Sequence, residues 1–264
     1  MINEIICIGT SFTEGHGLNP HSKDPDSNKA VSWYKENKNI IINDMKEYAW
    51  PNQLSELSGI KVRNLGKCGS SIEYLMRNVE EILESEDCSD KLFILEYSSW
   101  GRSELWSSEY KEWTVANWGH SNGKEPSDGY STFITTDYNG GNQLTLAHID
   151  IYNIFLNNFF NEHEYLVKRD RDLLNLLYKL TAKNISYQIF LLENIYLKEL
   201  ETNDLFNYRN LLDRDMWGYV TKKGWDLKTE TNGEVADAHP SITGHKNISK
   251  LFYKNLKKEW HNIK

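Results

Sequence analysis

Two patterns of apolar and polar positions alternate along the chain. The first is a short apolar run of the kind that forms a buried strand, of which "LFIL" within 91–99 is the plainest. The second places apolar residues three and four positions apart, as in an amphipathic helix. Strands are predicted at 3–9, 60–66, 91–99 and 185–194, and helices at 50–59, 71–85, 163–184 and 239–260. Because strands and helices alternate, the pattern predicts a parallel sheet wrapped by helices.

The order of these elements favours one three-layer α/β/α domain with a flavodoxin-like parallel sheet, spanning 1–264. A chain of 264 residues is long enough to bury one large core. Two stretches, 16–48 and 103–150, show no regular pattern, and the second is rich in Gly, Asn, Ser and Trp. We expect both to be long loop insertions, which in compact domains usually act as lids or binding loops.

Composition and charge exclude several classes of partner. The net charge of −8 argues against nucleic acid, because phosphate binding depends on clustered basic residues. No apolar run approaches the ~20 residues of a membrane-spanning helix. The opening "MINEIICIG" lacks the basic region of a signal peptide. We therefore expect a cytoplasmic protein, associated with the virus particle if the chain is of viral origin.

The cysteines indicate a reducing compartment. Cys7, Cys68 and Cys88 are too few and too scattered to predict a disulfide framework or a metal site.

Small and polar residues gather where the predicted strands end. The first strand runs into Gly9-Thr10-Ser11, the second into "NLGKCGSS" at 64–71, and the third into Ser98 and Ser99. The carboxyl ends of parallel strands share one edge of the sheet, where open α/β sheets bind their ligands. Ser11 at this edge is either a nucleophile or a cap for the following helix, since hydroxyls accept from the unpaired N–H groups there.

The C-terminal stretch "DAHPSITGH" adds an acid and a histidine, Asp237 and His239. A serine before the sheet and Asp-x-His after it favour a Ser-His-Asp arrangement, whose order along the chain differs between folds. The neighbouring Asp237 and Pro240 make His239 the preferred base. The histidines that compete with it are His245, His16, His120, His148 and His163.

Four blocks, "GTSFTEG", "WPNQL", "NLGKCGSS" and "DAHPSITGH", carry a resemblance to a known superfamily. With them the chain resembles the SGNH (GDSL-like) hydrolases. It is most similar to a viral and bacterial branch with Gly-Cys/Thr-Ser-Phe-Thr and Asp-x-His-Pro motifs. The resemblance covers roughly 1–15, 48–105 and 165–264. It implies the three-layer fold, ester hydrolysis, and a site without metal or cofactor.

Carried over to this chain, the resemblance makes Ser11 the nucleophile. His239 becomes the base that takes its proton and later protonates the leaving alcohol, and Asp237 becomes the residue that orients His239. The backbone N–H groups of Ser11 and Gly69 become donors of an oxyanion hole. The alternative for Gly69 is a glycine needed only for a tight turn.

Two departures from the superfamily pattern lie in these blocks. Thr10 stands where Gly-Asp-Ser has its aspartate, a position that supports the loop more than the chemistry. Asp237 lies two residues before His239 where the wider superfamily has three, and Glu234 is the alternative carboxylate if Asp237 points away.

The third departure lies in "LFILEYSSWGR", which lacks the Gly-x-Asn-Asp of the superfamily. Ser98, Ser99 or Trp100 stands in place of the asparagine donor. Ser99 is the natural replacement for the oxyanion donor. Trp100 and Arg102 are assigned to substrate binding, since a guanidinium offers several fixed donors to an anionic group. The alternative for Arg102 is an ion pair with Glu104 or a neighbouring acid.

The sequence thus predicts a serine esterase or deacylase acting on a small-molecule or carbohydrate ester, including O-acyl groups on sugars. Four tryptophans either pack the long loop onto the domain or stack on sugar rings: Trp100, Trp106, Trp113 and Trp118. The alternative is a non-catalytic module that keeps the fold to bind carbohydrate or a structural partner. The missing asparagine favours this alternative, and the set of Ser11, Gly69 and His239 argues against it.

Overall fold

A computed structural model describes 2–16, 18, 45–98, 102–107, 112–120, 130–134, 154, 158, 161–193, 203–209, 211–212, 215–228 and 235–259. Its strands are β1 (Glu4–Gly9), β2 (Lys61–Gly66), β3 (Lys91–Tyr97), β4 (Arg102–Ser107), β5 (Glu112–His120), β6 (Tyr130–Ile134), β7 (Ser186–Leu191), β8 (Asp226–Lys228) and β9 (Val235–Pro240). Its helices are α1 (Ser11–Glu14), α4 (Trp50–Ser58), α5 (Ile72–Ser85), α7 (Glu162–Ala182), α9 (Asp204–Arg209), α10 (Met216–Lys223) and α11 (Ile242–Glu259).

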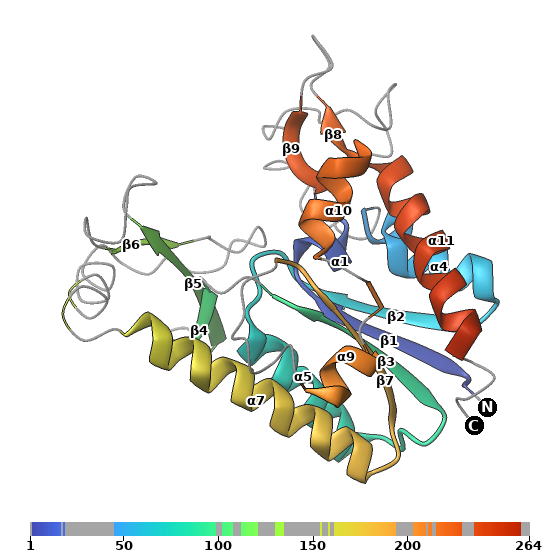
Figure 1. Ribbon diagram of the computed structural model, residues 1–264, viewed down its shortest axis with the longest axis horizontal. Helices are drawn as coiled ribbons and strands as arrows, with labels where there is room; N and C mark the ends of the chain where they lie inside the picture. Colours follow the sequence, from blue (N-terminus) through green and yellow to red (C-terminus); the bar gives the residue numbers. More distant parts are fainter. Residues whose placement is uncertain are drawn as a thin grey trace.

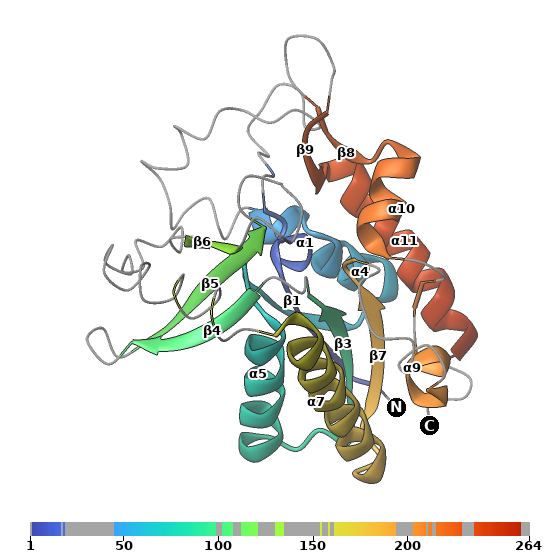
Figure 2. The same cartoon turned by 60° about the vertical axis from the view of Figure 1, so that its left-hand side comes forward.

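Four parallel strands form the central sheet, in the order β2-β1-β3-β7. This is the flavodoxin-like order over its first four strands. Helices α4 and α11 lie side by side on one face, and α5 and α7 lie on the other (Figures 1 and 2). The predicted fold class is therefore confirmed. The strands predicted at 3–9, 60–66, 91–99 and 185–194 are β1, β2, β3 and β7.

Both faces of the sheet are buried, which explains the apolar runs in the sequence. Successive side chains of a strand point to opposite faces. In β1, Ile5 and Cys7 pack into the core under α4, α10 and α11, whereas Ile6 and Ile8 pack into the core under α5 and α7. All four side chains are fully buried. A strand covered on both sides reads as continuously apolar.

A second, antiparallel sheet corrects the prediction that 103–150 has no regular structure. Strand β5 pairs with β4 on one side and with β6 on the other. The strands β4 to β6 stand to one side of the central sheet in both views (Figures 1 and 2). Gly, Asn and Ser, which favour turns, interrupt the alternation in this stretch and obscure the strands. Most of the other predicted loop, 16–48, lies outside the described residues.

The predicted terminal helix begins later than the sequence pattern indicates. Residues 235–240 form strand β9, which pairs with β8, and α11 starts at Ile242. Ser241 fixes this start, because its Oγ accepts a hydrogen bond from the Gly244 N–H at 3.1 Å. Among the helices that the structure describes, none has the length and apolarity to cross a membrane. One domain over 1–264 stays a prediction.

Candidate active site

Ser11 lies in the turn that leads from β1 into α1, at the carboxyl edge of the central sheet. Strand β1 ends at Gly9, Thr10 is extended, and Ser11 is the first residue of the short helix α1. The Ser11 side chain is buried. A Cβ at position 9 would overlap the side chains of Glu96 and Thr13, so only glycine lets the chain pass β3 this closely.

The structure brings His239 to Ser11. The Nε2 atom of His239, at the end of β9, lies 2.7 Å from the Ser11 Oγ. The distance is within normal hydrogen-bond length between a hydroxyl and an imidazole. Two residues from opposite ends of the chain are thus in direct contact at the sheet edge, where the sequence predicts them.

Aromatic rings surround the His239 imidazole. The Phe12 ring centroid lies 5.1 Å from that of His239, and the buried Phe12 stacks on Trp217 of α10 at 5.8 Å. The His16 ring packs against His239 in an edge-on arrangement, also at 5.1 Å between centroids. Trp217 is 40% exposed, so an aromatic face beside His239 is open to solvent.

The second histidine of "HPSITGH" has a structural role. His245 is fully buried in α11, and its Nδ1 accepts a hydrogen bond from the Trp50 N–H, at the start of α4, at 3.0 Å. Burial, together with the nearby His239, lowers the pKa of His245 to about 3. His245 therefore stays neutral and joins α11 to α4, which leaves His239 as the imidazole at Ser11.

The "NLGKCGSS" block, at the end of β2 and in the turn after it, packs against the same edge of the sheet. The Asn64 side-chain amide donates to the Thr13 backbone oxygen at 2.9 Å, which holds α1 against the end of β2. A Cβ at Gly66 would overlap the backbone nitrogen of Glu14. The Ser70 hydroxyl donates to the Gly9 oxygen at 2.9 Å. Glycine is needed at both turns of the block, by close approach at Gly66 and by left-handed backbone at Gly69.

Gly69 itself is buried and has φ +76°, a conformation that side chains rarely adopt. Within the described part of the chain, its N–H donates no hydrogen bond. An unused N–H on a fixed turn, next to the turn that carries Ser11, suits an oxyanion donor, so the two readings of Gly69 are compatible.

Glu96 is a further polar residue at this edge, and no sequence motif marks it as part of the site. Its side chain is fully buried in β3, and its carboxyl group accepts hydrogen bonds from the Thr10 N–H at 3.0 Å and from the Thr10 and Thr13 hydroxyls. Burial raises the pKa of Glu96, against the lowering effects of these hydrogen bonds and of the Arg102 charge. The signal was an acidic residue within an apolar strand, together with a threonine in place of the usual aspartate.

The alternative ion pair between Arg102 and Glu104 does not form among the described residues. Glu104 forms its ion pair with Arg77 of α5, at 3.0 Å, and not with Arg102. The buried Nη1 of Arg102 and the buried Oγ of Ser98 have no hydrogen-bond partner among the described residues. Within the described part of the chain, these two polar groups at the sheet edge are therefore without a hydrogen-bond partner.

Some predicted site residues, or their side chains, lie outside the described part of the chain. Ser99, Trp100 and Glu234 lie outside the described residues. The backbone of Asp237 lies in β9 opposite Leu227, but its side chain is outside the described part. The side chains of Trp106, Trp113 and Trp118 are outside it as well.

Fold and site together define an α/β protein with a serine and histidine pair at the carboxyl edge of its parallel sheet. No protein-family model matches the chain, and no curated protein matches it. Among solved structures, the chain is similar to the psychrotrophic esterase EstA from Pseudoalteromonas sp., with 14% identity, TM-score 0.45, and coverage of 98% of this chain and 99% of that one.

Two further solved structures show similarity at the same level. One is Axe2, an acetylxylan esterase from Geobacillus stearothermophilus, with 14% identity, TM-score 0.38, and coverage of 98% of this chain and 95% of that one. The other is a member of the lipolytic protein G-D-S-L family from Veillonella parvula, with 11% identity, TM-score 0.37, and coverage of 97% and 96%.

Proposed function

We propose that the chain is a serine esterase or deacylase in which Ser11 and His239 carry the reaction. The single observation that carries the proposal is the 2.7 Å contact between the Ser11 Oγ and the His239 Nε2. A nucleophile and its base have to lie within about 2.6–3.2 Å of one another for proton transfer. The contact meets this condition at the edge where parallel sheets bind ligands.

The reaction has two halves. Ser11 Oγ attacks the ester carbonyl carbon and passes its proton to His239 Nε2, which then protonates the leaving alcohol as the C–O bond breaks. A water molecule, deprotonated by His239, attacks the acyl-Ser11 ester in the second half and releases the acid. In both halves the N–H groups of Ser11 and Gly69 donate to the negative oxygen, and Asp237 orients His239.

The third oxyanion donor belongs to the end of β3. Ser99 is the proposed donor, and the adjacent Ser98 hydroxyl, buried and unpartnered within the described residues, is the other candidate at this position. Loss of one such donor typically costs about 10²–10³ in turnover. Separate Ser98→Ala and Ser99→Ala variants distinguish the two hydroxyls by which of them lowers kcat.

The proposed substrate class is an ester of a small molecule or a carbohydrate. Trp217 offers an exposed ring, stacked on Phe12 beside His239, on which a sugar or acyl group can pack. Arg102 is proposed to bind an anionic substituent, because its Nη1 has no hydrogen-bond partner among the described residues. Trp100 is proposed as a further contact. A Trp217→Ala variant that raises KM more than it lowers kcat supports the assignment.

The decisive experiment is hydrolysis of a p-nitrophenyl ester series, from acetate to octanoate, by the wild-type chain and by Ser11→Ala. We expect Ser11→Ala to lower kcat by about 10⁴-fold or more. The matched control is Ser85→Ala, an exposed serine on α5, which should keep full activity. A covalent phosphonate probe should label Ser11 in the wild type. Absence of both hydrolysis and labelling would favour the non-catalytic binding module.

A further inference from the structure

We propose that Glu14, His16 and Cys68 form a binding site for Zn²⁺ beside the Ser11–His239 pair. One ligand atom from each residue, a carboxylate oxygen, an imidazole nitrogen and the thiol sulfur, lies within 4.8 Å of the others. The site is separate from the hydrolytic groups.

The fold brings the three residues together through the same turns that build the active site. Glu14 is the last residue of α1, and Gly15, with φ +92°, turns the chain so that His16 follows directly. Cys68 lies in the turn after β2, one residue before Gly69. The Cys68 N–H donates to the Glu14 Oε2 at 2.9 Å, which fixes the two segments against each other. Two of the three residues, Glu14 and Cys68, are thus joined by a hydrogen bond, and His16 follows Glu14 by two positions in the same turn.

The three donors match the chemistry of zinc. Zn²⁺ in proteins is bound by thiolate, imidazole and carboxylate, whereas Mg²⁺ and Ca²⁺ prefer oxygen ligands alone. Around a tetrahedral zinc ion with bonds of about 2.0–2.3 Å, donor atoms lie roughly 3.3–3.8 Å apart. The three donor atoms, all within 4.8 Å of one another, therefore have to move closer together when the ion binds. Three protein ligands leave the fourth position to water, and binding releases the thiol proton of Cys68.

Burial favours the Glu14 carboxylate as a ligand. The Glu14 residue is only 8% exposed, and His16 and Cys68 are partly buried. A buried carboxylate is stabilised by a paired cation or by hydrogen bonds.

The cluster has no zinc-site signature in the sequence. Such signatures are close pairs of cysteines and histidines, whereas Cys68 and His16 follow different strands. The site therefore arises only from the approach of α1 to the end of β2.

Zinc at this position acts on the hydrolytic pair, an effect that rests on the proposed function. The His16 ring contacts the His239 ring at 5.1 Å between centroids. A cation bound to His16 places positive charge next to His239 and disfavours the imidazolium that forms when Ser11 is deprotonated. Turnover should therefore fall on zinc binding.

The direct test is zinc binding, measured by competition with a chromophoric chelator on the reduced, metal-free chain. We expect one tight site per chain in the wild type. Cys68→Ser, His16→Asn and Glu14→Gln should each weaken zinc binding at least as much as the roughly 10–100-fold that loss of an outer-sphere partner costs. Glu14→Gln keeps an oxygen that accepts from the Cys68 N–H, so it removes charge without removing the hydrogen bond.

Matched controls come from the same residue types elsewhere in the chain. Cys88→Ala and His163→Asn remove a buried thiol and an exposed imidazole outside the cluster, and both should keep wild-type zinc affinity. Circular dichroism of each variant checks that it is folded. Co²⁺ in place of Zn²⁺ gives a second readout, because a thiolate ligand produces a charge-transfer band in the near ultraviolet that Cys68→Ser should abolish.

The outcomes separate this proposal from the esterase proposal. Tight zinc binding that depends on Cys68 and His16 supports the site even if the chain hydrolyses no ester. Zinc affinity that is equal in the wild type and in Cys68→Ser, or the absence of the cobalt band, overturns it even if the esterase is active. In an active chain, zinc should inhibit the wild type and not Cys68→Ser.

Discussion

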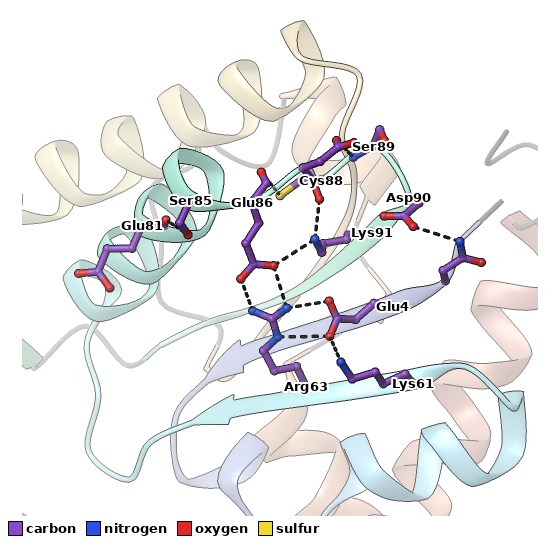
Figure 3. Close-up of polar contacts among 12 residues, drawn as sticks. Glu4, Lys61, Arg63, Glu81, Ser85, Glu86, Cys88, Ser89, Asp90 and Lys91 are labelled. Carbon is purple, nitrogen blue, oxygen red and sulfur yellow. Dashed lines mark hydrogen bonds and ion pairs between the residues drawn. The ribbon is translucent and has the colours of Figure 1, made fainter.

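The same three strands carry two polar regions with opposite properties at their two ends. At the amino ends, Arg63 of β2 bridges Glu4 of β1 at 2.7 Å and Glu86 at 2.6 Å, and Lys91 of β3 contacts Glu86 at 3.0 Å (Figure 3). At the carboxyl ends, the uncharged hydroxyls of Thr10 and Thr13 and one backbone N–H converge on Glu96.

Solvent explains the difference between these two regions. The side chains of Arg63 and Glu86 are both 30% exposed. The hydrogen bond from Arg63, and next the one from Lys91, lower the pKa of Glu86 to about 2. Glu96 is fully buried, and burial raises its pKa. Ion pairs in contact with water are screened, and each contributes little to the free energy of unfolding. A buried carboxyl group that accepts several hydrogen bonds fixes the position of its donors, and its removal is costly because those donors are left unsatisfied. We therefore expect the amino edge to contribute to stability alone, whereas the carboxyl edge contributes to stability and also fixes the position of Ser11.

Removal of the Glu96 carboxyl group should have the largest effect. Glu96→Ala leaves the Thr10 and Thr13 donors buried without an acceptor, at about 1–3 kcal/mol for each unsatisfied group. We expect the free energy of unfolding, measured in urea, to fall by about 3 kcal/mol or more. Turnover should also fall, because Thr10 immediately precedes Ser11. Glu96→Gln keeps one acceptor oxygen and should lie between Glu96→Ala and the wild type; equal stability of all three would contradict the assignment.

A side chain at Gly66 should produce the next largest effect. The added Cβ of Gly66→Ala would overlap the Glu14 backbone nitrogen, so α1 has to move away from β2. Overpacking of this kind costs typically about 1–3 kcal/mol. We expect a lower melting temperature and a lower kcat, because Ser11 moves with α1. The matched control is Gly59→Ala, where the added Cβ meets no neighbour but the left-handed backbone is strained; it should leave kcat unchanged while lowering stability slightly.

Loss of Arg63 at the opposite edge should affect stability only. Arg63→Ala removes ion pairs with Glu4 and Glu86 that are each worth about 0.2–1 kcal/mol at partly exposed positions. We expect a loss of about 1 kcal/mol in the free energy of unfolding and wild-type kcat and KM. Arg171→Ala, an exposed arginine on α7, serves as the control with no change in either. A drop in kcat for Arg63→Ala would show that the two edges are coupled.

The smallest effect is the contribution of Glu86 to stability in acid. Because its pKa is lowered in the folded chain from 4.5 to about 2, ionised Glu86 stabilises the fold above about pH 4.5, and this contribution is lost as the pH falls towards 2. The unfolding free energy of Glu86→Gln should therefore fall less steeply than that of the wild type over this range. High salt should reduce the difference between them. Identical slopes would contradict the role of the ion pairs.

The sequence predicted those parts of the fold whose pattern depends on local burial. The apolar run at 3–9 and the helical spacing over 71–85 arise because the core buries those side chains. The strand and the helix that they predict are confirmed as β1 and α5. Strand β9 was missed because its only pairing partner in the described residues is the three-residue strand β8, and such short pairing leaves no periodic apolar pattern in the sequence. The strands β4 to β6 were missed because their partners are one another, within a stretch rich in turn-forming residues.

The site shows the same limit. Ser11 and His239 were found because their motifs mark them and the carboxyl ends of parallel strands converge. Glu96 was not predicted as a site residue, because its role depends on the strand register that places it beside Thr10. Local sequence patterns do not specify this register. The cluster of Glu14, His16 and Cys68 likewise depends on the approach of two turns. Contacts between different strands and turns are therefore the features of the site that the sequence alone does not predict.

The 228-residue separation of Ser11 and His239 has a consequence for folding kinetics. Contacts between residues distant in sequence require the closure of a long loop, and topologies dominated by them fold slowly. The pair forms only when β9 has reached α1. When the chain refolds from urea, esterase activity should therefore return later than the circular dichroism signal of the sheet. The return of activity then measures the formation of the contact between Ser11 and His239.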